Sequence, residues 1–331
     1  MNRVRLLAAT SLLPLLALPL TAVPALGDEP RTDDPQVGVS RHAPLVQLRA
    51  TTQSGRTYVP APAPRAGHAA APAANIQVTY SGFTRPAKRA FQRAVNTWKP
   101  LLNSSVPIRV NASFQPLGAG VLGSAGPGNF WRDFDGAPTA GTWYADAIAN
   151  KRAGEDLAPG QPEIIARFNS NFSNWYYGGD GNPPNNRYDF ESVVLHELGH
   201  GLGFLGFGTV NGAGQGSVRG QGFPSAYDRF TENQGGTRLL TFPNNSTQLG
   251  NQLTSNQIYF DSPKVRNAAG GNRARLYAPA SWQQGSSYSH LNEGTYGPGN
   301  VNSLMTPAIA DAEAIHNPGP IVRAIFASTG W

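Results

Sequence analysis

A glutamate between two histidines forms the pattern H-E-x-x-H at His196, Glu197 and His200. On a helix, residues four apart share one face with Cβ atoms about 5–6 Å apart, so the two imidazoles can hold one metal ion. Imidazole nitrogens are common ligands of Zn²⁺. Glu197 is too close in sequence to chelate the same ion comfortably, but it can take a proton from a water molecule beside the metal. The pattern therefore predicts a catalytic zinc centre with Glu197 as its general base.

The segment that carries this pattern reads as an amphipathic helix. Apolar residues recur at every fourth position, namely Phe190, Val194 and Leu198. Asp189 is a candidate N-cap. Gly201 and Gly203 are poor helix formers, so we expect the helix to end just past His200. The competing interpretation is a buried amphipathic helix that happens to carry two histidines.

The third ligand must come from another part of the chain, because a catalytic zinc site normally takes three protein ligands and one water. Four of the six histidines lie outside the motif. His42 and His68 stand in a Pro/Ala-rich arm, where we expect bystanders. His316 precedes the last predicted helix and is interpreted as a capping or surface residue. His290 stands upstream of Met305, one of two methionines in the chain, and a carboxylate could also complete the site.

The order of these residues resembles the metzincin clan of zinc metallopeptidases. Residues 196–203 match the clan pattern H-E-x-x-H-x-x-G, whose glycine, here Gly203, permits a sharp turn beneath the metal. Most metzincins place a third ligand three residues later, where this chain has Gly206. The leishmanolysin branch is more similar, because a long insertion there separates the glycine from the third histidine and a methionine turn follows. The resemblance implies His290 as the third zinc ligand and Met305 as the apolar floor under the metal.

The resemblance implies a secreted zinc endopeptidase that hydrolyses peptide bonds in a protein or peptide substrate. Glu197 would take a proton from the attacking water and pass it to the leaving amine. Two other functions are compatible with the same motif. One is a zinc hydrolase that acts on cell-wall peptides, and the other is a secreted zinc-binding module without catalytic activity.

Several further positions are candidates for supporting roles. A gluzincin arrangement would use Glu232 on a second helix as the third ligand, but it would leave Gly203 and Met305 unexplained. Tyr288 and Tyr296 are both candidates for stabilising an oxyanion. Residues 164–168 are the candidate edge strand that would hold a substrate by main-chain pairing. The candidates for calcium binding are Asp180, Asn182, Asp228 and Asp261, although no spacing among them is diagnostic.

Composition and targeting signals indicate a secreted protein. Residues 1–27 have a basic start at Arg3 and Arg5, an apolar run over residues 6–20 and a small-residue cleavage site at residues 25–27. Removing this leader lowers the formal net charge from +6 to +4, and the basic residues are scattered, so we expect no nucleic-acid partner. No other stretch could span a bilayer, so we expect no membrane anchor. We also expect a monomer.

The rest of the chain predicts an α+β fold with one catalytic domain over residues 75–331. Residues 28–74 are a Pro/Ala-rich linker or pro-segment, with order beginning at Asn75. The absence of cysteine excludes inhibition by a cysteine that caps the zinc. The expected elements are strands at residues 76–80, 106–114, 120–124, 143–144 and 164–168, a helix capped by Thr84, a loop over residues 178–186 and a closing helix over residues 320–331. The resemblance implies a metzincin-like domain with a twisted mixed sheet, an active-site helix and an irregular insertion at residues 207–285.

Overall fold

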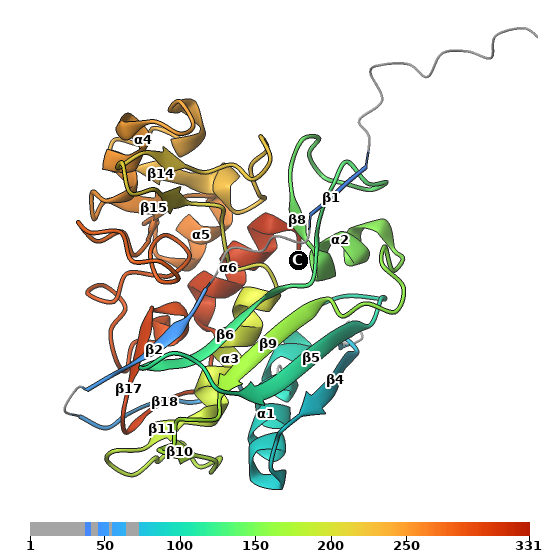
Figure 1. Cartoon of the computed structure of the whole chain (residues 1–331), viewed down its shortest axis with the longest axis vertical. Helices are drawn as coiled ribbons and strands as arrows, with labels where there is room; N and C mark the ends of the chain where they lie inside the picture. The colour runs from blue at the N-terminus through green and yellow to red at the C-terminus, as the bar shows by residue number, and fades with distance from the viewer. Residues whose placement is uncertain (1–36, 41–45, 53–54, 64–72) are drawn as a thin grey trace, which may run out of the picture. The chain divides into compact units, whose positions relative to one another are not determined.

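A mixed sheet of six strands lies at the centre of the described part of the chain, which is residues 37–40, 46–52, 55–63 and 73–331 of a computed structural model (Figure 1). In spatial order its strands are β17 (Ala308–Ala310), β2 (Leu48–Thr51), β6 (Val121–Pro127), β9 (Ile164–Asn169), β5 (Ile108–Gln115) and β4 (Ile76–Ser81). Strands β4, β5 and β9 are parallel, and β6 runs antiparallel to β9. The α+β class predicted from the sequence is confirmed. The predicted leader, His42 and His68 lie outside the described residues.

Helix α1 (Arg85–Trp98) connects the parallel strands β4 and β5, as its apolar stripe predicts. Thr84 caps the helix, because its hydroxyl accepts from the Ala87 amide, and Pro86 fits the first turn, where no amide partner is needed. The apolar stripe is buried along its whole length, at Ala87, Phe91, Val95 and Trp98. The turn η1 (Lys99–Leu101) then ends the helix.

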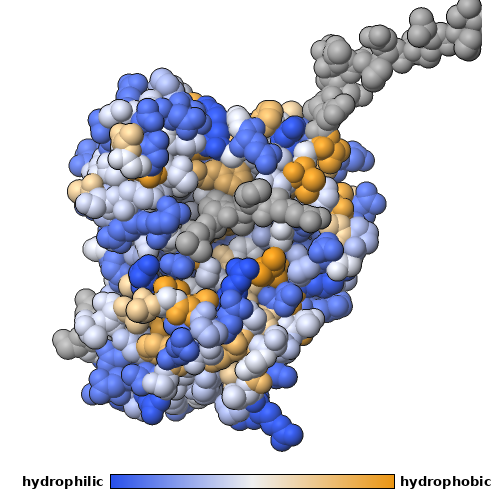
Figure 2. All heavy atoms as spheres, in the orientation of Figure 1, coloured by the Kyte–Doolittle hydropathy of each residue, from blue (hydrophilic) through white to orange (hydrophobic). Residues whose placement is uncertain are grey.

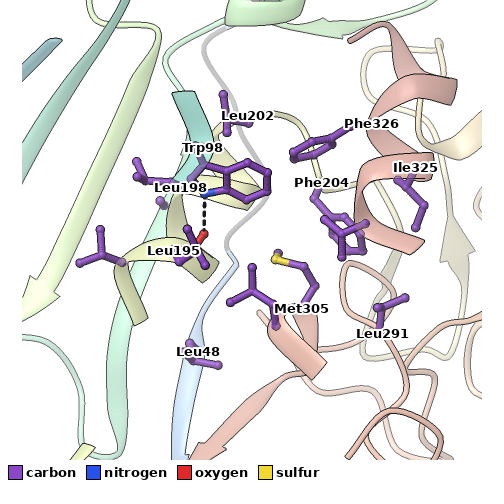
Figure 3. Packing of buried hydrophobic residues seen from close by; sticks show 14 of the residues in the cluster. Leu48, Trp98, Leu195, Leu198, Leu202, Phe204, Leu291, Met305, Ile325 and Phe326 are labelled. Atoms are coloured by element: carbon purple, nitrogen blue, oxygen red, sulfur yellow. Dashed lines mark hydrogen bonds between the residues drawn. The ribbon is translucent and has the colours of Figure 1, made fainter. Parts of the chain in front are cut away.

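Helix α3 (Phe190–Gly201) carries the H-E-x-x-H motif and packs against α1 and against strands β6 and β9, behind the sheet in the view of Figure 1. Asp189 is its N-cap, as predicted, and accepts from the Ser192 amide at 2.8 Å. The indole of Trp98 donates to the Leu195 carbonyl at 3.0 Å, which ties the two helices together (Figure 3). Every residue of α3 is buried, so neighbouring elements pack against the helix on all sides and fix the orientation of its histidines.

The N-terminal arm pairs with the rest of the fold, contrary to the expectation that order begins at Asn75. Strand β2 enters the central sheet, β3 (Thr57–Val59) pairs with β18 (Glu313–Ile315), and β1 (Gly38–Ser40) pairs with β7 (Phe130–Arg132). The arm has too little apolar content to fold alone, but each of its strands forms main-chain hydrogen bonds with a strand that is distant in the sequence. Such pairing cannot be predicted from local sequence patterns.

Residues 164–168 are not an edge strand, so that prediction is wrong. Strand β9 pairs with β5 on one side and β6 on the other. The edge strands of the sheet are β17 and β4, and the antiparallel strand β6 lies between β9 and β2 of the N-terminal arm.

A second small cluster of elements flanks the sheet. Strand β7 pairs with β8 (Tyr144–Ala145), which leads into helix α2 (Asp146–Ala153). The sequence reading missed α2, because its N-cap is Ala145 and no side chain caps it. Strands β10 (Trp175–Tyr176) and β11 (Tyr188–Asp189) bracket the predicted loop of residues 178–186 and lead into α3.

The insertion at residues 207–285 is more regular than expected. Three of its strands form an antiparallel sheet at the upper left of Figure 1, whereas its two short helices pack elsewhere, one beside β12 and β13 and the other against α6. In chain order its elements are β12 (Thr209–Val210), β13 (Gly216–Ser217), η2 (Asp228–Phe230), β14 (Thr231–Asn233), η3 (Leu239–Thr241), α4 (Thr247–Leu253), β15 (Ile258–Phe260), α5 (Pro263–Ala268) and β16 (Ala274–Arg275). Ser246 and Ser262 cap α4 and α5, because their hydroxyls accept hydrogen bonds from backbone amides of the first turn. A capping serine alone does not predict a helix as short as these two.

The chain ends with η4 (Ser303–Met305), strands β17 and β18, and helix α6 (Gly319–Thr329). The predicted closing helix is confirmed, with Ile321, Ile325 and Phe326 on its buried side. Among the residues that the structure describes, no helix is long and apolar enough to cross a membrane. Figure 2 shows apolar side chains on one face in separate patches among polar ones.

A buried ionic network fixes the start of α3. The prediction of His316 as a capping or surface residue is wrong. It is 3% exposed, Pro318 is the N-cap of α6, and His316 Nε2 lies 2.9 Å from Asp189 Oδ2. Its Nδ1 lies 3.8 Å from Glu191 Oε1, and Arg93 pairs with the same glutamate. Burial alone would lower the pKa of His316, but the hydrogen bond and charge of Asp189, together with Glu191, raise it above its usual value.

We predict that His316→Gln lowers the free energy of unfolding more at about pH 6 than at about pH 9. Because folding raises the pKa of His316, its stabilising contribution is fully present below the unfolded pKa of about 6.5 and is lost as the pH rises through the folded value. Urea unfolding of the parent and the variant at both pH values measures the difference. A difference that grows with pH would contradict a charged His316.

Candidate metal centre

The structure brings His196, His200 and His290 together, with the third histidine ninety residues after the second. The Nε2 atoms of His196 and His200 lie 2.9 Å apart, and His290 Nε2 lies 3.2 Å from His200 Nε2 and 3.3 Å from His196 Nε2. Three nitrogens bound to one tetrahedral Zn²⁺ at about 2.0–2.1 Å would stand about 3.3–3.4 Å apart. The spacing of the three nitrogens therefore fits a single small ion.

The opposite nitrogen of each ring is fixed by a backbone carbonyl. His196 Nδ1 lies 2.6 Å from Leu304 O, His200 Nδ1 lies 2.8 Å from Phe204 O, and His290 Nδ1 lies 2.7 Å from Ser286 O. A carbonyl oxygen can only accept, so each Nδ1 must carry the proton. Each Nε2 of a neutral ring then presents a lone pair to the other two, which a shared cation can satisfy and a hydrogen bond cannot.

Burial keeps the three rings in their neutral, ligating form. All three are at most 1% exposed. Burial lowers the pKa of His196 to about 4 and lowers the pKa values of His200 and His290 well below the usual value, with mutual repulsion adding to the effect for the last two. Neutral imidazoles are the form that binds metal. This cluster could hold a metal ion.

No other group of three or more imidazole or carboxylate donors gathers in this way within the described part of the chain. The proposed calcium candidates have other partners. Asp180 accepts from the Tyr176 hydroxyl, Asp261 pairs with Arg266, and Asp228 accepts from Tyr288. Calcium binding by these residues stays a prediction that the geometry does not favour.

The turn around Met305 supports the metal-binding helix from below. Leu304 supplies the carbonyl that orients His196, and the next residue is the fully buried Met305. A Cβ added to Gly199 would lie 2.8 Å from Met305 Sδ, so the thioether packs directly on the backbone of α3 between the two motif histidines. Trp98 packs on the same glycine, and Figure 3 shows both side chains beside α3. Gly199 is therefore needed for close approach.

Tyr288, two residues before His290, anchors the segment that carries this histidine. The Tyr288 ring lies over Gly206 and Gly208, where an added Cβ would come within 2.4 Å and 2.3 Å of ring carbons. The Tyr288 hydroxyl donates to the buried Asp228 at 2.7 Å and lies 2.9 Å from the hydroxyl of Thr231. Gly206 has no side chain, which leaves room for the Tyr288 ring.

Asp228 links Tyr288 to the segment that follows α3, and we call the bond between Tyr288 and Asp228 the Asp228 lock. Its carboxylate accepts from the Phe207 amide at 3.0 Å and from the Ser225 amide at 2.8 Å, in addition to Tyr288. Burial raises the pKa of Asp228 to about 6, and these hydrogen bonds act in the opposite direction. One carboxylate of the insertion thus holds the Tyr288 hydroxyl, the Phe207 amide and the Ser225 amide together. The sequence reading considered Asp228 only as a calcium ligand.

Glu197 is completely buried beside strand β6. A Cβ added to Gly123 would lie 2.8 Å from Glu197 Oε1, so only glycine allows the strand to pass so close to the carboxylate. Oε1 accepts from the Leu48 amide at 3.3 Å, whereas Oε2 has no hydrogen-bond partner among the residues that the structure describes. Burial raises the pKa of Glu197 well above its usual value, with the amides of Leu48 and Ala125 acting in the opposite direction. A buried carboxylate whose pKa is raised is suited to receive a proton.

The other candidates lie elsewhere or are engaged. Glu232 stands on strand β14, not on a helix, and pairs with Arg273 and Arg238, so the gluzincin arrangement is not supported. The Tyr288 hydroxyl is bound to Asp228, and the Tyr296 hydroxyl accepts from the Arg275 amide. The Tyr288 hydroxyl is therefore not free to donate to an oxyanion, and the role of Tyr296 stays a prediction.

Comparison of the chain with models of known protein families gives no match. Comparisons with curated proteins and with solved structures give none either.

We predict that Tyr288→Phe weakens zinc binding by about tenfold, as expected for loss of a group that orients a ligand. The variant removes the hydroxyl bond to Asp228 and loosens the seat of His290. Competition with a chromophoric chelator measures the affinity.

The matched control is Tyr296→Phe, which removes a hydroxyl that contacts the Arg275 amide and not the Asp228 lock. It should bind zinc like the parent. Equal zinc affinity in both variants would show that Tyr288 does not position His290.

Proposed function

We propose that the chain is a secreted zinc-dependent endopeptidase that hydrolyses peptide bonds in protein or peptide substrates. The observation that carries the proposal is the placement of three neutral imidazoles, with their Nε2 atoms 2.9–3.3 Å apart, on the helix and loop that also present Glu197. Three histidines leave one position of a tetrahedral zinc open, which is the arrangement of catalytic rather than structural sites.

Glu197 is the general base of this proposal. A zinc ion held by His196, His200 and His290 would supply a Lewis acid for the scissile carbonyl and for water. Glu197 takes the proton of the attacking water on its free oxygen and delivers it to the leaving amine. Burial raises the pKa of the Glu197 carboxyl above its usual value, which makes the carboxylate a stronger proton acceptor than an exposed glutamate.

The resemblance to the leishmanolysin branch of the metzincins supports the same function. It rests on the order of His196, His200, Gly203, the insertion, His290 and Met305. Two features of the site agree with it. Gly203 has a positive φ of 110° where the chain turns away from α3, and Met305 packs beneath the metal-binding helix. We assign secretion from the leader-like composition of residues 1–27.

We predict that Glu197→Gln abolishes cleavage of casein and retains bound zinc, because the amide cannot accept the proton and the three imidazoles are unchanged. The measurements are casein zymography, with and without prior limited proteolysis to open any precursor form, and zinc content by elemental analysis. Cleavage by the variant at the rate of the parent would contradict the role of Glu197.

The matched control is Glu232→Gln, which changes the rival third ligand in the same way. Because Glu232 pairs with two arginines away from the histidines, the control should keep both zinc and chelator-sensitive cleavage. Loss of zinc in this control would favour the gluzincin arrangement instead.

A further inference from the structure

A slot one strand wide runs across the metal centre, and residues 46–51 fill it. Strand β6 forms one wall of the slot and β17, which follows Met305, forms the other. Neighbouring strands stand about 4.8 Å apart, so without β2 the edges of β6 and β17 would lie about 10 Å apart. The floor includes Glu197, because Gly123 of β6 packs directly on its side chain.

Main-chain hydrogen bonds hold the filling segment to both walls. Leu48 pairs with Gly123, and the Ala50 amide donates to Gly120 O at 2.9 Å. On the other side the Arg49 amide donates to Pro307 O at 3.2 Å, and the Gln47 amide donates to Gly285 O at 2.9 Å. The last contact lies next to Ser286, whose carbonyl orients His290. An extended peptide docked between two sheet edges is bound in the same way.

The segment also engages the proposed general base. The Leu48 amide donates to Glu197 Oε1 at 3.3 Å, the one hydrogen bond that reaches this carboxylate from the N-terminal arm. Glu197 is 0% exposed in this arrangement, and the three histidines are at most 1% exposed. A base that must meet water and a peptide bond needs access that this arrangement does not give.

Side chains along the segment alternate between the interior and solvent. Val46 and Leu48 are 1% and 2% exposed, whereas Arg49 is exposed. Val46 packs with an aromatic cluster that includes Phe130 and Phe207, and Leu48 packs into the main core. The slot therefore accepts extended chains with apolar side chains at alternate positions.

We propose that residues 46–51 occupy the substrate groove of the peptidase, so that the chain is made in a closed form in which its own N-terminal arm stands in for the substrate. This inference rests on the proposed function. The edge of β6 is the substrate-binding strand, and the preferred substrate is an extended peptide with an aliphatic residue where Leu48 now lies. The closure uses main-chain pairing and the base itself, and it needs no cysteine, which the chain lacks.

The first test compares two aspartate substitutions on the same strand in the full chain loaded with zinc. Leu48→Asp places a carboxylate in the apolar core that Leu48 fills and should expel the segment, whereas Arg49→Asp places the same group on the solvent side. We expect Leu48→Asp to release zinc to an excess of chelator about tenfold faster than the parent or more, because the lost burial of a leucine is worth at least that factor. Arg49→Asp should release zinc like the parent. Casein cleavage should rise only in Leu48→Asp.

Leu48→Asp could release zinc simply because it folds poorly, so a second variant and a synthetic peptide test the same inference. Ala50→Pro removes the amide that donates to Gly120 without burying a charge, and it should act in the same direction. The synthetic peptide VQLRATT, the sequence of residues 46–52, should slow zinc release from both opened variants. The same peptide with aspartate at the leucine position should have no effect. Rescue by added peptide would not follow from a general loss of stability.

The outcomes separate this inference from the proposed function. Unchanged zinc release in folded Leu48→Asp and Ala50→Pro, or casein cleavage by the parent as fast as by these variants, would overturn the occupied groove while leaving the peptidase intact. Faster zinc release that the peptide reverses, without cleavage of casein or of a peptide library by any variant, would support occupation of the slot and contradict the peptidase.

Discussion

Three imidazole lone pairs that face one another in a dry interior are the constraint on which the rest of this structure depends. Each ring donates its Nδ1 proton to a backbone carbonyl, so none of the Nε2 atoms has a proton to share. Bringing such groups within 2.9–3.3 Å without a cation costs free energy, because buried lone pairs then lack partners. A bound metal ion removes this cost, and its binding free energy then contributes to folding.

The surrounding elements serve to hold that arrangement. Packing against α1 and the sheet fixes α3, and Met305 supports it from below. The insertion has its own small sheet, and its Asp228 ties it to Tyr288, two residues before His290. The N-terminal arm reaches the same site through the Leu48 amide, which donates to Glu197. Segments that are distant in the sequence therefore meet at one centre, and each is tied there by backbone groups or by a buried carboxylate.

Features encoded by local spacing could be predicted from the sequence, and features that depend on distant partners could not. The motif on α3, its cap at Asp189 and the stripe of α1 follow from residues three or four apart. The place of His290 came from a resemblance in the order of motifs, since nothing near it in sequence indicates a ligand. His316 was misread because its partner Asp189 lies 127 residues away. The strands of the arm were missed for the same reason, and α2 because no side chain caps it.

X-ray absorption spectroscopy at the zinc edge tests the central claim most directly, because it counts the ligands of the bound ion. For the chain loaded with one equivalent of zinc, we predict three imidazole nitrogens at about 2.0–2.1 Å and one further oxygen ligand. A spectrum with two imidazoles, with a protein carboxylate in place of the third, or without ordered ligation would contradict a centre built from His196, His200 and His290.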